Sequence, residues 1–125
     1  MTVPVLQADI DEQNHVNNTV YLRWVQDVAT AHWRSLTSVE AQREIGWVVL
    51  RHEIDYKIPA CLGDEILLRT WVGEASRLKF ERFTEVRRKK DNRLLATART
   101  VWVPIDWQTG KPTRVSADVR ARFSI

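Results

Sequence analysis

The sequence predicts a single α+β domain in which an antiparallel sheet of about five strands wraps around one long central helix. The first observation is that apolar residues in the stretch 19–36 recur at helical spacing, with no glycine or proline among them. The second is that the apolar pattern changes to a period of two after Gly46 and keeps it through the following segments. Short connections join these segments, so they are expected to form an antiparallel meander and to bury their apolar face on the helix.

The elements of the N-terminal part follow from local signals. Residues 3–9 alternate loosely and predict a short strand at the sheet edge, where a proline is tolerated. The polar run 11–18 predicts a loop, and Asn17 or Asn18 is expected to cap the following helix. The apolar stripe of that helix is wide, which predicts a largely buried element about 25 Å long. A second short helix is expected at 37–45, where a Thr-Ser pair precedes an acidic first turn and a glycine follows.

Four strands are expected in the remainder of the chain, each bounded by turn residues. They span residues 47–58, 65–72, 78–88 and 94–106. The third of them alternates strongly, so one of its faces is expected to be dry and the other wet. Asp91 and Asn92 predict a hairpin turn before the last strand, and the tail 116–123 is weakly helical.

Length and composition are those of one globular domain covering residues 1–125. The single cysteine, Cys61, excludes an internal disulfide and a zinc site of several cysteines, and nothing in the sequence predicts a metal or a cofactor. The chain opens without a signal peptide, and no apolar run is long enough to span a bilayer, so a cytoplasmic protein without a membrane partner is expected. The net charge of +3 is mild, and nucleic acid is not expected as a partner because the basic residues are not interleaved with aromatic ones.

The stretch before and into the long helix carries the most specific pattern of the chain. It reads Asp9-x-Asp11-x-x-x-His15-Val16-Asn17-Asn18-x-x-Tyr21-Leu22-x-Trp24. This pattern resembles the opening signature of hotdog-fold acyl-CoA thioesterases of the 4-hydroxybenzoyl-CoA thioesterase-like family, and it is also similar to that of acyl-ACP thioesterases. Weaker matches follow in order at Asp55-Tyr56, Pro59-Ala60, Gly63-Asp64 and Thr109-Gly110-Lys111-Pro112. The resemblance implies a hotdog fold, an acyl-CoA or acyl-ACP substrate, and a homodimer or homotetramer.

One position of the signature departs from the pattern of the family. Many relatives have glycine immediately before the histidine, where this chain has Asn14. The loop therefore needs a residue other than glycine to take a left-handed conformation, which asparagine tolerates better than most residues.

Hydrolysis of a thioester needs a nucleophile or an activated water, together with donors for the oxyanion that develops. By resemblance, Asp11 matches the catalytic carboxylate, which either attacks the carbonyl carbon or acts as general base on water; the sequence leaves both routes open. A backbone N–H near Asn18 is implied as the oxyanion donor, assisted by the positive end of the helix dipole. His15 is implied to hold a water or to orient Asp11, and the Asn17 side chain to position water or to brace the loop.

The same side chains also have structural interpretations. Asp9 and Asp11 are both candidates for simple capping acids, which loops before helices often carry. A structural hydrogen bond is the alternative role for His15. For Asn17 and Asn18, capping of the helix is expected over a chemical role.

Other polar residues are expected to be structural in the first place. His32 lies on the apolar stripe of the long helix and is expected to be a core histidine with its hydrogen bonds satisfied. Asp27 is expected to form an i, i+4 ion pair with Arg23, and a catalytic role is its alternative. His52 or Glu53 would reach a pocket only from a neighbouring subunit.

The pocket is expected between subunits, with the acyl chain along the central helix beside Tyr21 and Trp24. The resemblance implies that Arg77 and Lys79, at the start of a strand, contribute cations to the phosphates of coenzyme A. The basic run 87–90 is the alternative source of such cations, although a charge run at a hairpin tip is usually just solvated.

A non-catalytic module that binds acyl-CoA or an acyl carrier on the same fold is the competing function. The presence of Asp11 and His15 argues against it, because binding alone requires neither residue. Trp24, Trp33 and Trp47 are candidates for capping the pocket, but the sequence does not tell which face it occupies.

Overall fold

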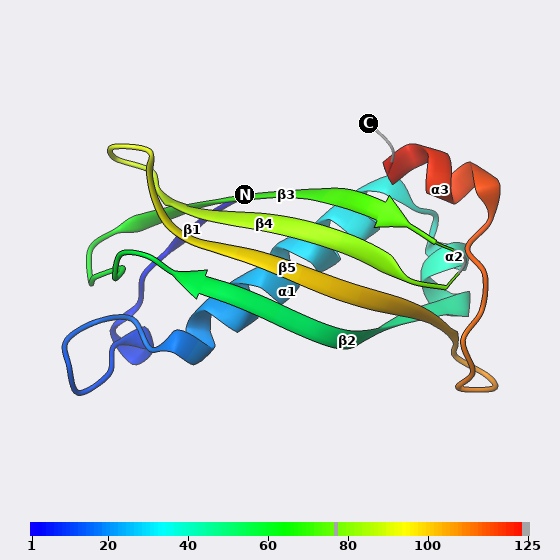
Figure 1. The fold of residues 1–125 in the computed structure, drawn as a ribbon, viewed down its shortest axis with the longest axis horizontal. Coiled ribbons are helices and arrows are strands. Elements are labelled where there is room, and N and C mark those ends of the chain that lie inside the picture. The colour runs from blue at the N-terminus through cyan, green and yellow to red at the C-terminus, as the bar shows by residue number, and fades with distance from the viewer. Residues whose placement is uncertain (77, 124–125) are drawn as a thin grey trace.

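The computed structural model describes residues 1–76 and 78–123 and shows a sheet that curls around one long helix (Figure 1). The five strands are antiparallel and lie in the order β1-β3-β4-β5-β2. The predicted meander of the four long strands is wrong for the first of them, because β2 crosses to the far edge of the sheet and pairs with β5 instead of β3. The elements are β1 (Thr2–Pro4), a 3-10 turn (Gln7–Asp9), α1 (Asn18–Leu36), α2 (Val39–Glu44), β2 (Ile45–Tyr56), β3 (Glu65–Ala75), β4 (Phe80–Arg88), β5 (Arg93–Asp106) and α3 (Ala117–Phe123). In this part of the chain no helix is both long and apolar enough to cross a membrane.

The long helix α1 forms because a good N-cap precedes an uninterrupted apolar stripe. Asn17 is the N-cap, and its side-chain oxygen accepts a hydrogen bond from the N–H of Thr19 at 2.9 Å. The helix begins at Asn18, one residue earlier than predicted, and ends at Leu36 as predicted. Its buried residues recur at the spacing of one helix face: Val20, Tyr21, Trp24, Val25, Val28, Ala29 and Trp33.

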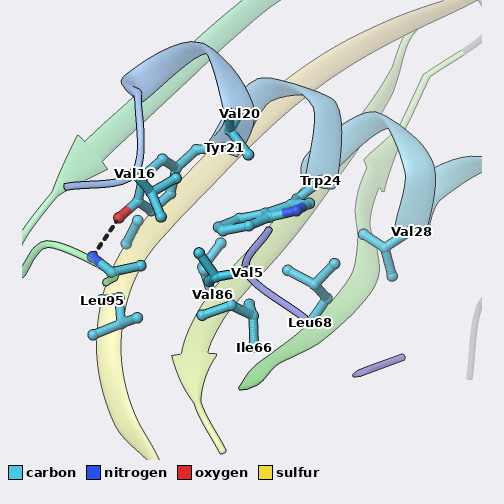
Figure 2. Close-up of a cluster of buried hydrophobic side chains, with 12 residues drawn as sticks. Val5, Val16, Val20, Tyr21, Trp24, Val28, Ile66, Leu68, Val86 and Leu95 are labelled. Atoms are coloured by element: carbon cyan, nitrogen blue, oxygen red, sulfur yellow. Dashed lines mark hydrogen bonds between the residues drawn. The ribbon is translucent and has the colours of Figure 1, made fainter. Parts of the chain in front are cut away.

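The core lies between α1 and the inner face of the sheet. Trp24 is the largest fully buried side chain, with 2% of its surface exposed. Figure 2 shows its ring over Ile66 and Leu68 of β3 and Val86 of β4. Burial of so large a ring against two strands joins the helix firmly to the sheet. The predicted sheet wrapped around one helix is confirmed.

The predicted strands are present, but their ends differ from the prediction. β3 runs on through the predicted turn to Ala75, because pairing with β4 continues as far as the Ala75–Phe80 pair. Gly46 lies inside β2 instead of ending α2. The ring of Trp107 packs on this glycine so closely that a Cβ there would lie 2.6 Å from it. Gly46 is therefore required by packing and not by the end of a helix.

The predicted strand at 3–9 is wrong beyond Pro4. Residues Gln7–Asp9 form a 3-10 turn, and the carboxylate of Asp9 accepts a hydrogen bond from the N–H of Leu6 at 2.9 Å. The chain has to turn here to pass from the edge of the sheet to the start of α1. The loose alternation of the sequence does not reveal this turn, because the turn is stabilised by the side chain of Asp9, the last residue of the segment.

Candidate active site

A small loop joins the 3-10 turn to α1 and carries the residues of the most specific sequence pattern. Ile10 and Val16 pair across its base as an isolated antiparallel bridge. Inside the loop the N–H of Asp11 donates to the carbonyl of His15 at 2.8 Å, and the N–H of Asn14 donates to the carbonyl of Asp11 at 3.1 Å. The loop is therefore closed by its own backbone, and it lies just ahead of α1 (Figure 1).

Asn14 adopts the left-handed conformation that closing this loop requires, with a φ of 65°. Replacing it with alanine is expected to lower the free energy of unfolding by about 1 kcal/mol, whereas glycine is expected to cost nothing, since only glycine is free of the Cβ penalty. Urea denaturation of the unchanged chain and of the Asn14→Ala and Asn14→Gly variants measures the free energy of unfolding of each. Gln13→Ala is the control, because Gln13 is an exposed neighbour without a positive φ. Equal losses for the two alanine variants would contradict the expectation.

The carboxylate of Asp11 is held at one oxygen only. Its Oδ1 accepts hydrogen bonds from the N–H groups of Gln13, at 2.9 Å, and His15, at 3.4 Å. Its Oδ2 accepts none from the residues that the structure describes, and the side chain is partly exposed. The ring of His15 is exposed, so the backbone of His15 and not its imidazole orients Asp11. A carboxylate oriented in this way is suited to attack a carbonyl carbon or to take a proton from water.

The start of α1 follows the loop directly and offers a backbone donor. The Asn17 cap engages both the N–H of Thr19, at 2.9 Å, and its hydroxyl, at 2.8 Å. The N–H of Asn18 donates no hydrogen bond to any residue in 1–76 or 78–123. Because it lies at the positive end of a 19-residue helix dipole, this N–H is suited to hold a negatively charged oxygen.

Asp9, the first acid of the pattern, is a buried structural residue. Only 2% of its surface is exposed, and its Oδ1 forms an ion pair with Arg23 at 3.0 Å. Its carbonyl accepts a hydrogen bond from the N–H of Asn17 at 2.8 Å. These contacts join the 3-10 turn to the helix cap. The predicted pair of Arg23 with Asp27 is wrong, because Arg23 reaches back across the helix start to Asp9.

The segment after β2 anchors the loop from the side of the core. The N–H of Val16 donates to the carbonyl of Ala60 at 2.9 Å, and the N–H of Ala60 donates to the hydroxyl of Tyr21 at 2.9 Å (Figure 2). The hydroxyl of Tyr56 donates to the carbonyl of Asn18 at 3.1 Å. Burial raises the pKa of the Tyr21 hydroxyl, so this anchor stays uncharged near neutral pH.

The residues predicted to contact substrate lie in different surroundings. Tyr21 and Trp24 are 3% and 2% exposed and belong to the core, so their contact with a substrate stays a prediction. Lys79 is exposed just before β4. Arg77 lies outside the described residues.

The basic run 87–90 forms a hairpin tip whose charges are largely engaged. The ion pairs are Arg87 with Glu85, Arg88 with Asp91 and Lys89 with Glu65. The guanidinium of Arg88 lowers the pKa of the Asp91 carboxyl to about 2. The structure thus favours the solvated hairpin tip over a cation source for this run.

His32 on α1 and His52 on β2 are both half-buried. Nδ1 of His32 lies 3.0 Å from Nη1 of Arg82, so His32 has the hydrogen-bond partner that was predicted, but it lies at the margin of the core and not within it. Burial and the charge of Arg82 lower the pKa of its ring. Nδ1 of His52 lies 3.1 Å from the hydroxyl of Thr100, and burial lowers its pKa as well. Glu53 is paired with arginines on the opposite face of β2.

A cavity of about 650 Å³ lies toward the C-terminal end of α1. It is bounded by the C-terminal half of α1, by α2 and by the first residues of β2, with β4 and β5 beneath. Its helix wall begins at Gln26, so about 12 Å of helix separates it from Asn18. Of the three tryptophans named as candidates for capping a pocket, Trp33 and Trp47 line it and Trp24 does not. Its other aromatic walls, Phe80, Trp102 and Trp107, were not predicted.

The remaining groups that could carry chemistry are metal ligands and the thiol of Cys61. Among residues 1–76 and 78–123, no group of three or more His, Cys, Asp and Glu side chains is placed to hold a metal ion. The thiol of Cys61 is free and exposed in the turn after β2. The described part of the chain therefore has two notable places, the Asp11 loop with the start of α1, and the aromatic cavity.

Comparison with known proteins agrees with this architecture. A family model described as the thioesterase-like superfamily matches residues 5–123. A 1,4-dihydroxy-2-naphthoyl-CoA thioesterase from Synechocystis is similar at a TM-score of 0.85 and 21% identity, covering 98% of this chain and 93% of that one. A thioesterase from Thermus thermophilus, complexed with coenzyme A and Zn, is similar at a TM-score of 0.84 and 25% identity, covering 98% and 89%. No curated protein matches significantly. The likeness confirms the predicted hotdog fold.

Proposed function

This chain belongs to the thioesterase-like superfamily and is a thioester hydrolase, and we propose that it hydrolyses the thioester of an acyl group with coenzyme A. The observation that carries the proposal is the carboxylate of Asp11, oriented through one oxygen with the other unengaged, just ahead of α1. Two relatives support coenzyme A as the thiol: the Thermus thermophilus protein is complexed with it, and the Synechocystis protein is named for a CoA thioester. An acyl carrier protein is the alternative carrier of the thiol.

Asp11 is proposed as the catalytic carboxylate, by one of two routes. As a nucleophile, Oδ2 attacks the carbonyl carbon, the C–S bond breaks, the thiolate leaves, and water then hydrolyses the mixed anhydride. As a general base, Asp11 takes a proton from the water that attacks, and the thiolate leaves and receives the proton. Both routes yield the free acid and the thiol, and both need the unengaged oxygen.

The start of α1 is proposed to stabilise the negative oxygen that forms on the carbonyl. The N–H of Asn18 donates to it, and the helix dipole adds to the attraction. The Asn17 side chain is committed to capping, so its contribution is to keep these N–H groups in place. The ring of His15, exposed at the loop, is proposed to hold a water beside Asp11.

A second copy of the chain is proposed to complete the site by pairing along β2. This strand of 12 residues ends the sheet, so one of its backbone edges is left for a further strand. Exposed apolar side chains along it, Val48 at 48% and Leu50 at 59%, favour contact with another copy. The result is a homodimer, or a homotetramer of two such dimers.

Antiparallel pairing of β2 with its own copy would bring the two notable places together. Tyr56, at the end of β2, contacts Asn18 at the start of α1, whereas Trp47, at the start of β2, lines the cavity. An antiparallel pair places the end of one strand beside the start of the other. The Asp11 loop of one copy then faces the cavity of its partner, which is proposed to hold the acyl group. Arg77 and Lys79 stay the proposed contacts of the phosphates.

A panel of acyl-CoA thioesters, with short, long and aromatic acyl groups, tests this function through release of free thiol. The assay uses a Cys61→Ser variant, because the exposed thiol of Cys61 would otherwise react with the thiol reagent. Turnover of at least one acyl-CoA is expected. Binding without thiol release from any acyl-CoA or acyl carrier protein would overturn the proposal and favour a binding module.

A further inference from the structure

The aromatic cavity is positively charged. Three cations line it, Arg34, Arg43 and Arg82, against one carboxylate, that of Glu81. Glu81 is already engaged, because Arg99 of the neighbouring strand donates a hydrogen bond to it and thereby lowers the pKa of its carboxyl. The field inside the cavity therefore favours a negatively charged ligand.

Arg82 is the most deeply placed of the three cations. It projects from β4 with 7% of its surface exposed, and its Nη1 donates to the hydroxyl of Thr70 at 3.1 Å and lies 3.0 Å from Nδ1 of His32. No carboxylate pairs with it among residues 1–76 and 78–123. Burial lowers the pKa of its guanidinium to about 10, so it is still charged at neutral pH. A buried cation without a counter-charge is stabilised by any anion that reaches it.

Two residues that line the cavity each carry a further donor, which has no acceptor among the described residues. The Nε1 atoms of Trp47 on β2 and Trp102 on β5 are buried, and neither finds a hydrogen-bond partner among the described residues. An indole N–H only donates, so an acceptor has to come from elsewhere. The ring of Trp47 is held by edge-to-face packing, with its centre 5.1 Å from that of Phe80 and 5.3 Å from that of Trp33. The donor of Trp47 is thus held in place by neighbouring aromatic rings.

We propose that this cavity binds a carboxylate on an aromatic or short aliphatic body, so that the acyl group of the preferred substrate bears a second, free carboxylate. The inference rests on the proposed function, because it names the substrate class of the same site. The guanidinium of Arg82 carries a positive charge without a carboxylate partner among the described residues, and the two indole N–H groups are donors without an acceptor there. A carboxylate only accepts and is negative, whereas a hydroxyl or amide would bring donors and no charge.

Matched small ligands test the ligand class without turnover. Benzoate and benzamide share one ring and nearly one shape but differ in charge, as do butyrate and butyramide on a short aliphatic chain. Isothermal titration of the full chain is expected to show the carboxylate of each pair binding about tenfold to a hundredfold more tightly than its amide. Equal affinities within both pairs would overturn the proposal.

Variants assign the preference to the cavity. Arg82→Gln is expected to bring the affinities of benzoate and benzamide together, and Arg82→Lys, which restores the charge, to recover part of the difference. Trp102→Phe keeps an aromatic ring but removes the donor, so it is expected to weaken benzoate more than benzamide. The matched controls are Arg69→Gln and Trp71→Phe, both at exposed positions of β3 outside the cavity. If Arg82→Gln does not fold, Trp102→Phe decides, and an undiminished preference in it overturns the proposal.

The corresponding CoA thioesters separate this inference from the proposed function. Faster hydrolysis of isophthaloyl-CoA than of benzoyl-CoA would support both. Hydrolysis of the two at equal rates, with equal binding of each carboxylate and its amide, would overturn the inference and leave the thioesterase function standing. A carboxylate preference in binding without hydrolysis of either thioester would overturn the proposed function and support the ligand class of the cavity.

Discussion

Replacing Asp11 with asparagine is expected to lower kcat for the best acyl-CoA by about a hundredfold to ten thousandfold. Asparagine has the same shape, and its side-chain oxygen still accepts from the N–H groups of Gln13 and His15. It loses the negative charge, so it neither attacks a carbonyl carbon nor takes a proton from water. Steady-state kinetics on the variant give kcat and KM separately, and KM is expected to change little because the loop keeps its form.

The matched control is Asp27→Asn, which removes the same charge from an exposed position on α1. Its kcat is expected to stay near that of the unchanged chain, since Asp27 lies more than two turns beyond the start of the helix. Thermal unfolding should be alike for both variants. A drop in kcat with Asp27→Asn and none with Asp11→Asn would mean that Asp27, and not Asp11, is the catalytic carboxylate.

Mixing two inactive variants tests whether the site is shared between copies. Thr30 is exposed and lines the cavity, so Thr30→Trp is expected to fill it and abolish turnover. In a mixed dimer of a Thr30→Trp chain and an Asp11→Asn chain, one of the two sites has both an intact carboxylate and an intact cavity. Refolding the two variants together is therefore expected to restore about a quarter of the activity. No recovery would place the carboxylate and the cavity of each site in one chain.

Replacing Trp24 with alanine is expected to lower the free energy of unfolding by about 3–5 kcal/mol, the largest loss expected from a change in the core. The ring is 2% exposed and packs against β3 and β4 beneath α1 (Figure 2), so its removal leaves a hole between the helix and the sheet. Urea denaturation, with the midpoint and slope fitted together, measures the change.

Trp71→Ala is the matched control for Trp24→Ala, since it removes the same side chain from the outer face of β3. Trp71 is 39% exposed and stacks on Phe83 with ring centres 5.9 Å apart. The loss there is expected to be about 1 kcal/mol, the contribution of an exposed aromatic pair. Similar losses at the two positions would mean that α1 is not joined to the sheet through Trp24.

The parts of the site that depend on neighbours in the chain were predictable. The cap at Asn17, the left-handed residue Asn14 and the buried stripe of α1 depend on contacts within a few residues, so local chemistry reveals them. The same holds for the order of the strands along the chain, which the period of the apolar pattern reveals. Their pairing was predictable only in part: β3, β4 and β5 pair in sequence across short connections, whereas β2 pairs with β5 and not with β3.

The sequence by itself thus determined the elements, their order and a carboxylate loop ahead of a helix. Tertiary structure alone decided that Arg23 pairs with Asp9, that Gly46 makes room for Trp107, and that Arg82 is buried among aromatic rings. Each of these contacts joins residues that are distant in the chain. Periodicity tells which face of an element is apolar, but what lies opposite that face depends on how helix and sheet pack, and so the cavity appears only in the folded chain.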